Sequence, residues 1–430
     1  MDKKARRIDR LQNIAIAVLT LTFAALLLQT PLFGDDAVVS AVRGWFADRQ
    51  APSTEETDAL TALSVPVRIV QTNGFLCSGA DALTTSDAAF EAVGSFLGEA
   101  IGSAYSISSV SESALLNAME LSGLYFEFAC DLPLEVLCAR LSVQPPTTRA
   151  LDVHRCLLSV DGEANAILYL QDPQQGVFRF STAVSASAVQ TYLETLDGGD
   201  ADFTRTLGPE YDSLSPYTIV FDEVSERRTL SAANALSDYP SEELLRRVEF
   251  NPHTKDRYVE SSGTEVIIEG QRKLYLYPNG TIVYSGGTAE SGSLFAVTAA
   301  DAVHLSRAEL CAAARSLIGS LTQGRIGDAA LYLSGMASDD TGVTVTFDYM
   351  ADGTPLRFSD GTHAAEVRIE GRSITGFTLR ARRYTLSERS SLLLPLPLTC
   401  AIAQRYPGCE LSIAYIDSYG DSVDASWVAD

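Results

Sequence analysis

The sequence predicts an α+β protein in which a single N-terminal transmembrane helix is followed by extracytoplasmic domains of antiparallel sheet, with helices packed on one face. Three observations predict this fold class. A long uncharged segment lies near the start, apolar residues at helical spacing precede groups of alternating apolar and polar residues, and short turn sequences separate these groups. Helices that precede runs of strands are typical of layers in which helices cover a sheet.

The segment from Leu11 to Phe33 carries no charge in twenty-three residues, and a helix needs ~20 residues to cross a bilayer. Five basic residues precede this segment, whereas Asp35 and Asp36 follow it. The positive-inside rule therefore predicts a cytoplasmic tail over residues 1–10, a transmembrane helix over 11–33 and an extracytoplasmic remainder. We expect a single-pass protein of the cell membrane. A cleaved signal peptide is the alternative, but bulky residues after Leu28 offer no cleavage site.

The predicted transmembrane helix has a candidate partner face made of Asn13, Ala17, Thr20 and Ala24. Small residues let membrane helices approach closely, and polar groups can form hydrogen bonds across the contact. The last three residues are spaced at i, i+3 and i+7 and so share one side of the helix. The alternative is that alanine and threonine are ordinary residues of a membrane helix and contact no partner there.

The charge balance excludes several classes of partner. Five of the 32 basic and two of the 55 acidic residues precede the membrane, which leaves 27 basic against 53 acidic groups outside, a balance of −26. Nucleic acid and anionic lipid surfaces are therefore poor partners. The seven cysteines form no C-x-x-C pair, so we predict no metal site and no cofactor. A disulfide between Cys400 and Cys409 remains open.

Residues 34–64 are polar and mixed in charge, and we predict a stalk there. The first extracytoplasmic domain is predicted over 65–224. One helix is expected after Asp87, where apolar residues recur at helical spacing, and a second from Glu112 to Leu121. Alternation with a period of two then predicts strands. These cover 124–128, 157–160, 166–170, 177–180 and 217–221.

A small middle domain is predicted over 225–292. Its helix spans Ser241 to Val248, and two strands, 273–277 and 281–284, follow it. Pro278, Asn279 and Gly280 lie between these strands, and Asn-Gly supplies the positive φ that a tight turn requires. Asn279 also begins a glycosylation sequon, but the turn explains the sequence better.

The C-terminal domain is predicted over 293–430. Ser306 and Glu309 form a capping box at the start of a helix that ends near Gly324. Strict alternation then predicts strands over 343–349, 365–369 and 377–381, with a second helix near 397–405 and a last strand over 411–415. Turns are expected at Asp352-Gly353 and at Gly371. One face of this sheet is predicted to be buried and the other solvated.

No catalytic motif stands out, and we predict no catalytic residue and no small-molecule substrate. His363 follows Asp360, which could orient an imidazole, but a solvated pair in a turn is the simpler interpretation. The acidic loop from Asp197 to Asp202 could offer oxygens to Ca²⁺, yet it lacks the ordered ligand spacing of a calcium loop. The exterior is therefore interpreted as a binding surface.

Several sequence patterns follow one another along nearly the whole chain: Leu124–Phe128, Phe250–Tyr258, Leu274–Tyr284, Phe347–Tyr349, Gly353–Leu356, Ala364–Ile369 and the closing Trp427. In this order they resemble the YycH/YycI-type regulators of the WalK sensor histidine kinase of Gram-positive bacteria. Overall length and a three-part layout are more similar to the YycH member, and the last domain also looks like the YycI domain.

This resemblance implies no reaction. It implies a membrane-anchored, non-enzymatic extracytoplasmic regulator of a two-component sensor histidine kinase that controls cell-wall metabolism. The expected partners are a WalK-like kinase and a sister YycI/YycH-type protein, contacted through the transmembrane helix and the exterior domains. The main alternative is an envelope-binding module that scaffolds wall enzymes, and an extracytoplasmic hydrolase without a recognisable motif comes third.

Overall fold

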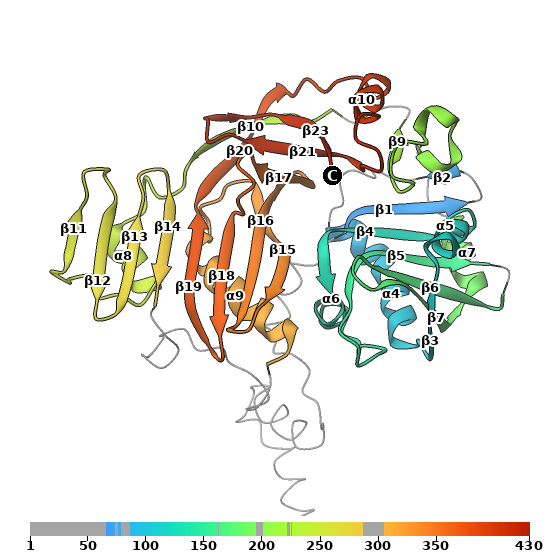
Figure 1. Cartoon of the computed structure of the whole chain (residues 1–430), viewed down its shortest axis with the longest axis horizontal. Helices are drawn as coiled ribbons and strands as arrows, with labels where there is room; N and C mark the ends of the chain where they lie inside the picture. The colour runs from blue at the N-terminus through green and yellow to red at the C-terminus, as the bar shows by residue number, and fades with distance from the viewer. Residues whose placement is uncertain are drawn as a thin grey trace, which may run out of the picture. The chain divides into compact units, whose positions relative to one another are not determined.

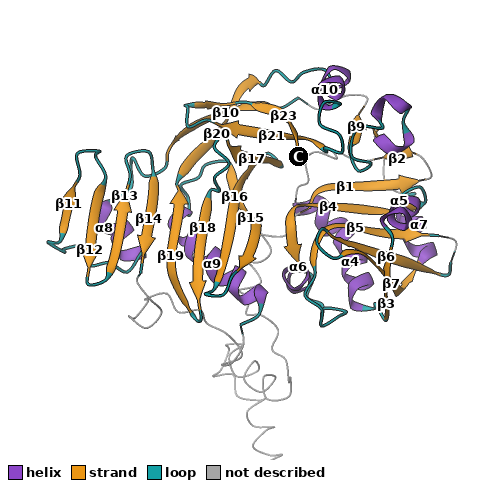
Figure 2. Cartoon of the chain, in the orientation of Figure 1, coloured by secondary structure: helices purple, strands orange, loops and turns teal. Residues whose placement is uncertain are grey.

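The computed structural model describes residues 66–73, 76–78, 87–161, 163–194, 201–221, 224, 226–286 and 305–430. The predicted tail, transmembrane helix and stalk lie outside these residues, as do Asn13, Ala17, Thr20, Ala24 and most of the acidic loop that begins at Asp197. Within the described ranges, no helix is both long enough and apolar enough to cross a membrane. The described residues form seven α-helices and three sheets, which confirms a mixed α+β architecture (Figure 2).

The first sheet has nine antiparallel strands in the order β3-β7-β6-β5-β4-β1-β2-β8-β9 (Figure 1). Four helices accompany it: α4 (Asp87–Gly102), α5 (Glu112–Ala118), α6 (Leu134–Arg140) and α7 (Ala186–Leu193). The strands are β1 (Pro66–Asn73), β2 (Leu76–Ser78), β3 (Ser106–Val110), β4 (Ser122–Pro133), β5 (Asp152–Val160), β6 (Asn165–Asp172), β7 (Gly176–Ser185), β8 (Ala201–Phe203) and β9 (Ile219–Phe221). Two 3₁₀ turns, Thr204–Thr206 and Pro209–Tyr211, connect β8 to β9.

Both faces of the first sheet are covered, which corrects the expectation that helices pack on one face only. Leu124 and Phe126 of β4 share a hydrophobic cluster with Leu97 of α4. Tyr125, on the other side of the same strand, clusters with Leu115 of α5. Alternation along β4 therefore does not separate a buried from a solvated face, because each face meets its own helix.

The second sheet has eleven strands, in the order β11-β12-β13-β14-β19-β18-β16-β17-β21-β23, with β15 beside β16. Helices α8 (Ser241–Arg247), α9 (Arg307–Thr322) and α10 (Leu396–Ala403) belong to this part of the chain. The strands are β11 (Arg257–Val259), β12 (Glu265–Glu269), β13 (Arg272–Leu276), β14 (Thr281–Ser285), β15 (Ala329–Ser338), β16 (Val343–Ala351), β17 (Thr354–Phe358), β18 (Ala365–Glu370), β19 (Ser373–Arg380), β21 (Leu411–Asp417) and β23 (Ala425–Ala429). All pairs in this sheet are antiparallel except β17 with β21.

Several local features of this sheet agree with the predictions from the sequence. Ser306 and Glu309 form the predicted capping box on α9. The β13–β14 hairpin forms as predicted, and Gly280 in its turn has a φ of +91°. Asp352 and Gly353, at +50° and +67°, make the expected turn between β16 and β17. Strands β16 and β18 bury alternate residues, as predicted, and the residues between them are partly exposed.

Pairing between β14 and β19 places strands of the predicted middle and C-terminal domains in one sheet. The limits of the three predicted domains stay a prediction. A small third sheet joins β10 (Arg228–Asn234) to β20 (Arg382–Ser390) and β22 (Ser422–Val423). One hydrophobic cluster includes Phe126 of the first sheet and Phe347 of the second, so both sheets share a core.

Candidate functional site

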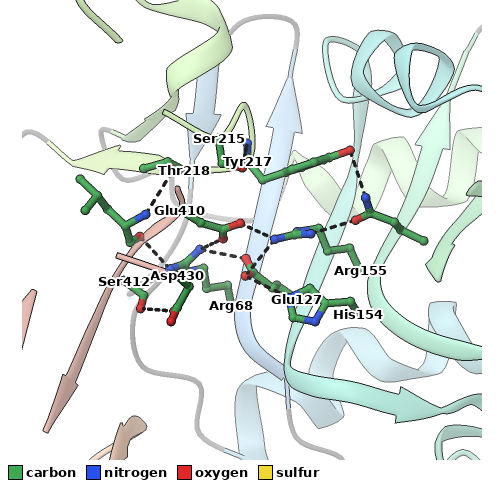
Figure 3. A network of polar contacts seen from close by, with 12 residues as sticks. Arg68, Glu127, His154, Arg155, Ser215, Tyr217, Thr218, Glu410, Ser412 and Asp430 are labelled. Carbon is green, nitrogen blue, oxygen red and sulfur yellow. Dashed lines mark hydrogen bonds and ion pairs between the residues drawn. The ribbon is translucent and has the colours of Figure 1, made fainter. Parts of the chain in front are cut away.

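A buried network of charged side chains lies where the nine-stranded sheet meets the start of β21 (Figure 3). Arg68 comes from β1, Glu127 from β4 and Arg155 from β5, and Glu410 directly precedes β21. The sheet register produces most of this arrangement, because Arg68 pairs with Glu127 and Glu127 pairs with Arg155 on the next strand. Gln171 of β6 continues the row opposite Arg155. Cross-strand neighbours of opposite charge attract each other.

Glu410 joins this row from 342 residues away in the sequence. Arg68 Nη1 donates to Glu127 Oε2 and to Glu410 Oε1, both at 2.9 Å. Arg155 Nη2 donates to Glu410 Oε2, and Arg68 Nη2 donates to the carbonyl of Leu411 at 3.3 Å. The two guanidinium groups therefore hold the C-terminal strand against the first sheet.

Aromatic and amide side chains complete the network. The Arg155 guanidinium lies 4.3 Å from the centre of the Tyr217 ring. Its Nη1 donates to Gln171 Oε1 at 2.9 Å, and Tyr217 Oη donates to Glu112 at 3.0 Å. Tyr125 Oη donates to Glu127 at 3.4 Å. These contacts fix the orientation of both carboxylates.

The two carboxyl groups respond differently to this environment. Burial raises the pKa of Glu410 to about 7, and the negative charge of Glu127 acts in the same direction. Burial also disfavours the charged form of Glu127, but Arg68 and Arg155 outweigh it and lower its pKa. One carboxyl is therefore firmly ionised and the other exchanges its proton near neutral pH.

The network lacks a nucleophile positioned beside a base, and in the described residues no three His, Cys, Asp or Glu side chains group as metal ligands. Its groups bind one another, so it acts as a clamp between distant segments. Little in the sequence predicts this network. Glu127 is the single charged residue of the otherwise apolar Leu124–Phe128 segment, and this isolated charge is the one feature that indicates a buried ion pair. No sequence pattern indicates that Glu410 takes part.

His363 does not pair with Asp360. Its Nδ1 lies 2.9 Å from Asp348 Oδ2, whereas Asp360 accepts from Thr362 and Tyr419. Ser334 Oγ also lies 3.3 Å from His363 Nδ1. Because serine and aspartate share one ring nitrogen, the imidazole cannot relay a proton between them as a catalytic triad requires.

His253 lies in a turn in which its backbone N–H donates to Asn251 Oδ1 at 3.0 Å. Cys400 and Cys409 are both free thiols, so the disulfide left open between them is not formed. Cys409 is held instead by packing and by its thiol, which donates to the carbonyl of Ala403.

An exposed apolar groove lies beside α10. It has a volume of about 170 Å³, which is comparable to a cavity of roughly 150 Å³ that accepts one benzene ring. Leu392, Tyr406 and Leu398 are 98 %, 62 % and 49 % exposed. Grouped apolar side chains of this kind are typical of protein contact surfaces. The residues that line the groove include Leu392, Leu394, Ile402, Tyr406, Trp427 and Val428.

No protein family model matches the chain, and no curated protein matches its sequence. The crystal structure of YycH from Bacillus subtilis does match its fold, over 86 % of this chain and 94 % of that chain, with a TM-score of 0.55 and 10 % sequence identity. The chain has the YycH fold. The resemblance seen in the sequence is therefore confirmed at the level of the fold. The YycH likeness extends over most of the described residues and is not limited to one sheet.

Proposed function

We propose that this chain is a membrane-anchored, non-enzymatic regulator of a two-component sensor histidine kinase, with its bulk outside the cell. It acts by protein contacts through its transmembrane helix and its exterior, and its output is cell-wall metabolism. The observation that carries the proposal is the likeness to the YycH fold over 86 % of the chain. The sequence patterns that resemble the YycH/YycI regulators support it as well, because they depend on the residues alone and not on the fold.

Two features of the exterior support a binding role. The α10 groove offers exposed apolar surface, and apolar burial is a main source of affinity between proteins. The charged cluster at Glu410 is buried and occupied by its own partners, which suits a structural clamp better than a substrate site.

A reconstituted system tests the proposal. The full chain and a WalK-type kinase from the same organism are placed in lipid vesicles, and the rate of kinase autophosphorylation is measured. We expect the rate to change at least about twofold when the chain is present, since a coupling of even 1 kcal/mol alters an equilibrium about fivefold. A membrane protein of similar size and unrelated fold is the control. An unchanged rate, with no complex formed, contradicts the proposal, and a complex with wall enzymes instead of the kinase favours the scaffold.

The topology is tested separately in protoplasts. Because the charges flank residues 11–33 asymmetrically, external protease is expected to digest the bulk of the chain and leave a short membrane-held fragment. Complete protection contradicts this orientation. Release of an intact soluble protein into the medium indicates a cleaved signal.

A further inference from the structure

Glu410 sits at a joint between two distant parts of the chain. The segment around it is fixed to residues that precede β9. Gly408 N donates to Ser213 O and Ser215 N donates to Cys409 O, each at 2.7 Å. Leu411 N donates to Thr218 Oγ1 at 3.2 Å. The Glu410 side chain adds the charged contact to β1 and β5, so its ionisation bears directly on how β21 is held.

Two carboxyl groups share one guanidinium nitrogen at this joint. Glu127 Oε2 and Glu410 Oε1 both lie 2.9 Å from Arg68 Nη1, so these oxygens are no further apart than twice that distance. Both side chains are largely shielded, with exposed fractions of 7 % and 13 %. Two negative charges that are this close and shielded from water repel each other, which favours a proton on one of them.

We propose that Glu410 is a pH-responsive latch: its protonated carboxyl holds the start of β21 on the nine-stranded sheet, and loss of that proton to solvent loosens the contact. The inference goes beyond the regulatory function and does not depend on it, because the latch is a property of the isolated chain.

The groups that face Glu410 determine the direction of the effect. Arg68 from β1 and Arg155 from β5 favour its charged form. Burial and Glu127 from β4 favour the neutral form. Tyr217, from the segment before β9, lies over Arg155, and the charge of Glu410 helps to raise the pKa of this tyrosine. Tyr125 lies behind Glu127, and the backbone of Glu410 pairs with that of Asp430.

The sign of the pH dependence follows from the raised pKa of Glu410. Between its ordinary value of 4.5 and about 7, the folded protein binds a proton that the released segment does not bind. The contact is therefore strongest at or below pH 4.5, weakens as the pH rises to about 7, and then stays constant. Glu127, whose pKa is lowered, contributes stability above its ordinary pKa and loses it only in stronger acid. An ordinary salt bridge would instead weaken on acidification.

Hydrogen exchange of the full chain in lipid nanodiscs tests the latch between pH 5 and pH 9, after correction for the intrinsic pH dependence of exchange. We expect amide protection in β21 to fall by about 10- to 100-fold between pH 5 and pH 8.5, since each unit of pKa shift is worth a factor of ten. Strands β16 and β18, at the centre of the second sheet, should keep their protection. They serve as the internal reference.

Two variants test whether ionisation of Glu410 causes the pH-dependent loss of protection in β21. Glu410→Gln cannot lose a proton and should show no pH-dependent loss of protection in β21. Glu127→Gln removes the like charge, so the loss should move to lower pH while the Arg68–Glu410 contact remains. Protection of β21 that is independent of pH in the unmodified chain overturns the latch, and so does an unchanged pH response in Glu410→Gln. If Glu410→Gln fails to fold, the unmodified chain and Glu127→Gln still decide the question.

Discussion

At the scale of single residues, a buried charged side chain is stable only with the partners that form ion pairs and hydrogen bonds with it. Arg68 and Glu127 are each only 5 % exposed, and each is charged because the other is present. A buried ion pair adds little net stability relative to apolar residues, but removing one member leaves an uncompensated charge. The same physics explains Asp417, which is fully buried and accepts from both Arg382 and Tyr384. These two clusters are where the structure is least tolerant of single substitutions.

Arg68→Met is expected to destabilise the chain strongly. The variant keeps most of the aliphatic bulk but leaves Glu127 and Glu410 with one guanidinium between them, so the free energy of unfolding should fall by about 3–5 kcal/mol. Urea denaturation at pH 7 measures it. Arg246→Met is the matched control, because Arg246 forms an exposed i,i+4 pair with Glu242 and should cost less than about 1 kcal/mol. Equal losses in the two variants contradict the role assigned to burial.

His363 provides a second pH-dependent prediction, of the same sign as that of Glu410 but at a higher pH, because both groups have a raised pKa in the folded chain. Its hydrogen bond to Asp348 raises the pKa of His363 above its ordinary 6.5. The stabilisation is therefore fully present below pH 6.5 and is lost as the pH rises through the raised value. His363→Gln should lower the melting temperature more at pH 5.5 than at pH 8.5, by a small amount because the imidazole is partly exposed.

Kinase regulation measured with His363→Ala and Asp360→Ala together should stay unchanged, since neither residue belongs to a catalytic arrangement. Loss of regulation in a folded double variant shows that this turn has a role we have not assigned. An equal shift in the melting temperature of His363→Gln at both pH values contradicts the Asp348 hydrogen bond.

At the scale of secondary-structure elements, local patterns were predictable and long-range pairing was not. Strands β16 and β18 alternate strictly because only one of their faces is fully buried. The α9 capping box depends on four consecutive residues, Ser306 to Glu309, so it can be recognised from the local sequence. Strand β4 also alternates in sequence, yet both of its faces are buried, so its pattern does not show which face a helix covers. The pairing of β10 with β20 joins Leu230 to Leu386, and no local pattern reports such a contact. The contact of Glu410 with Arg68 could not be predicted for the same reason, because it joins residues that are far apart in the sequence.

The two sides of helix α10 lie in different environments. Leu396 and Cys400 face a hydrophobic cluster, whereas Leu398 and Ile402 are 49 % and 43 % exposed. Leu396→Ala should lower the free energy of unfolding by about 2–4 kcal/mol, because it leaves a cavity. Leu398→Ser with Ile402→Ser should change it by less than about 1 kcal/mol, yet weaken kinase regulation if the exterior contacts its partner there. Unaltered regulation in that double variant excludes this side of α10 as the contact.

At the scale of the whole molecule, the two large sheets of the described residues are connected by shared side-chain contacts. A single hydrophobic cluster runs from the first sheet into the second, and Arg307 at the start of α9 pairs with Asp152 of β5. The charged network at Glu410 adds a third connection between sequence-distant segments. The two sheets are therefore connected by apolar packing and by ion pairs. How a signal reaches the kinase is a separate question, because the segment that would cross the membrane lies outside the described residues.

Residues 11–33 are predicted to cross the membrane and to contact the kinase there. The hydrophobic effect does not drive helices together inside a bilayer, so contact with a kinase helix would depend on close packing at Ala17, Thr20 and Ala24 and on the amide of Asn13. Ala17→Leu with Ala24→Leu should abolish regulation while membrane insertion and exterior folding persist, because larger side chains separate the helices without lowering hydrophobicity. Leucine substitutions at Val18 and Phe23, which are already bulky, provide the matched control and should preserve regulation.

A chimera completes this test. Replacement of residues 11–33 by an unrelated membrane-spanning helix should abolish regulation as the double leucine variant does, with the exterior still folded and displayed. Autophosphorylation of the co-reconstituted kinase is the measurement. If the chimera regulates normally, small residues in the helix have no special role, and the signal passes through the exterior alone. The α10 groove is then the first surface to examine, since its apolar side chains are already exposed in the folded chain.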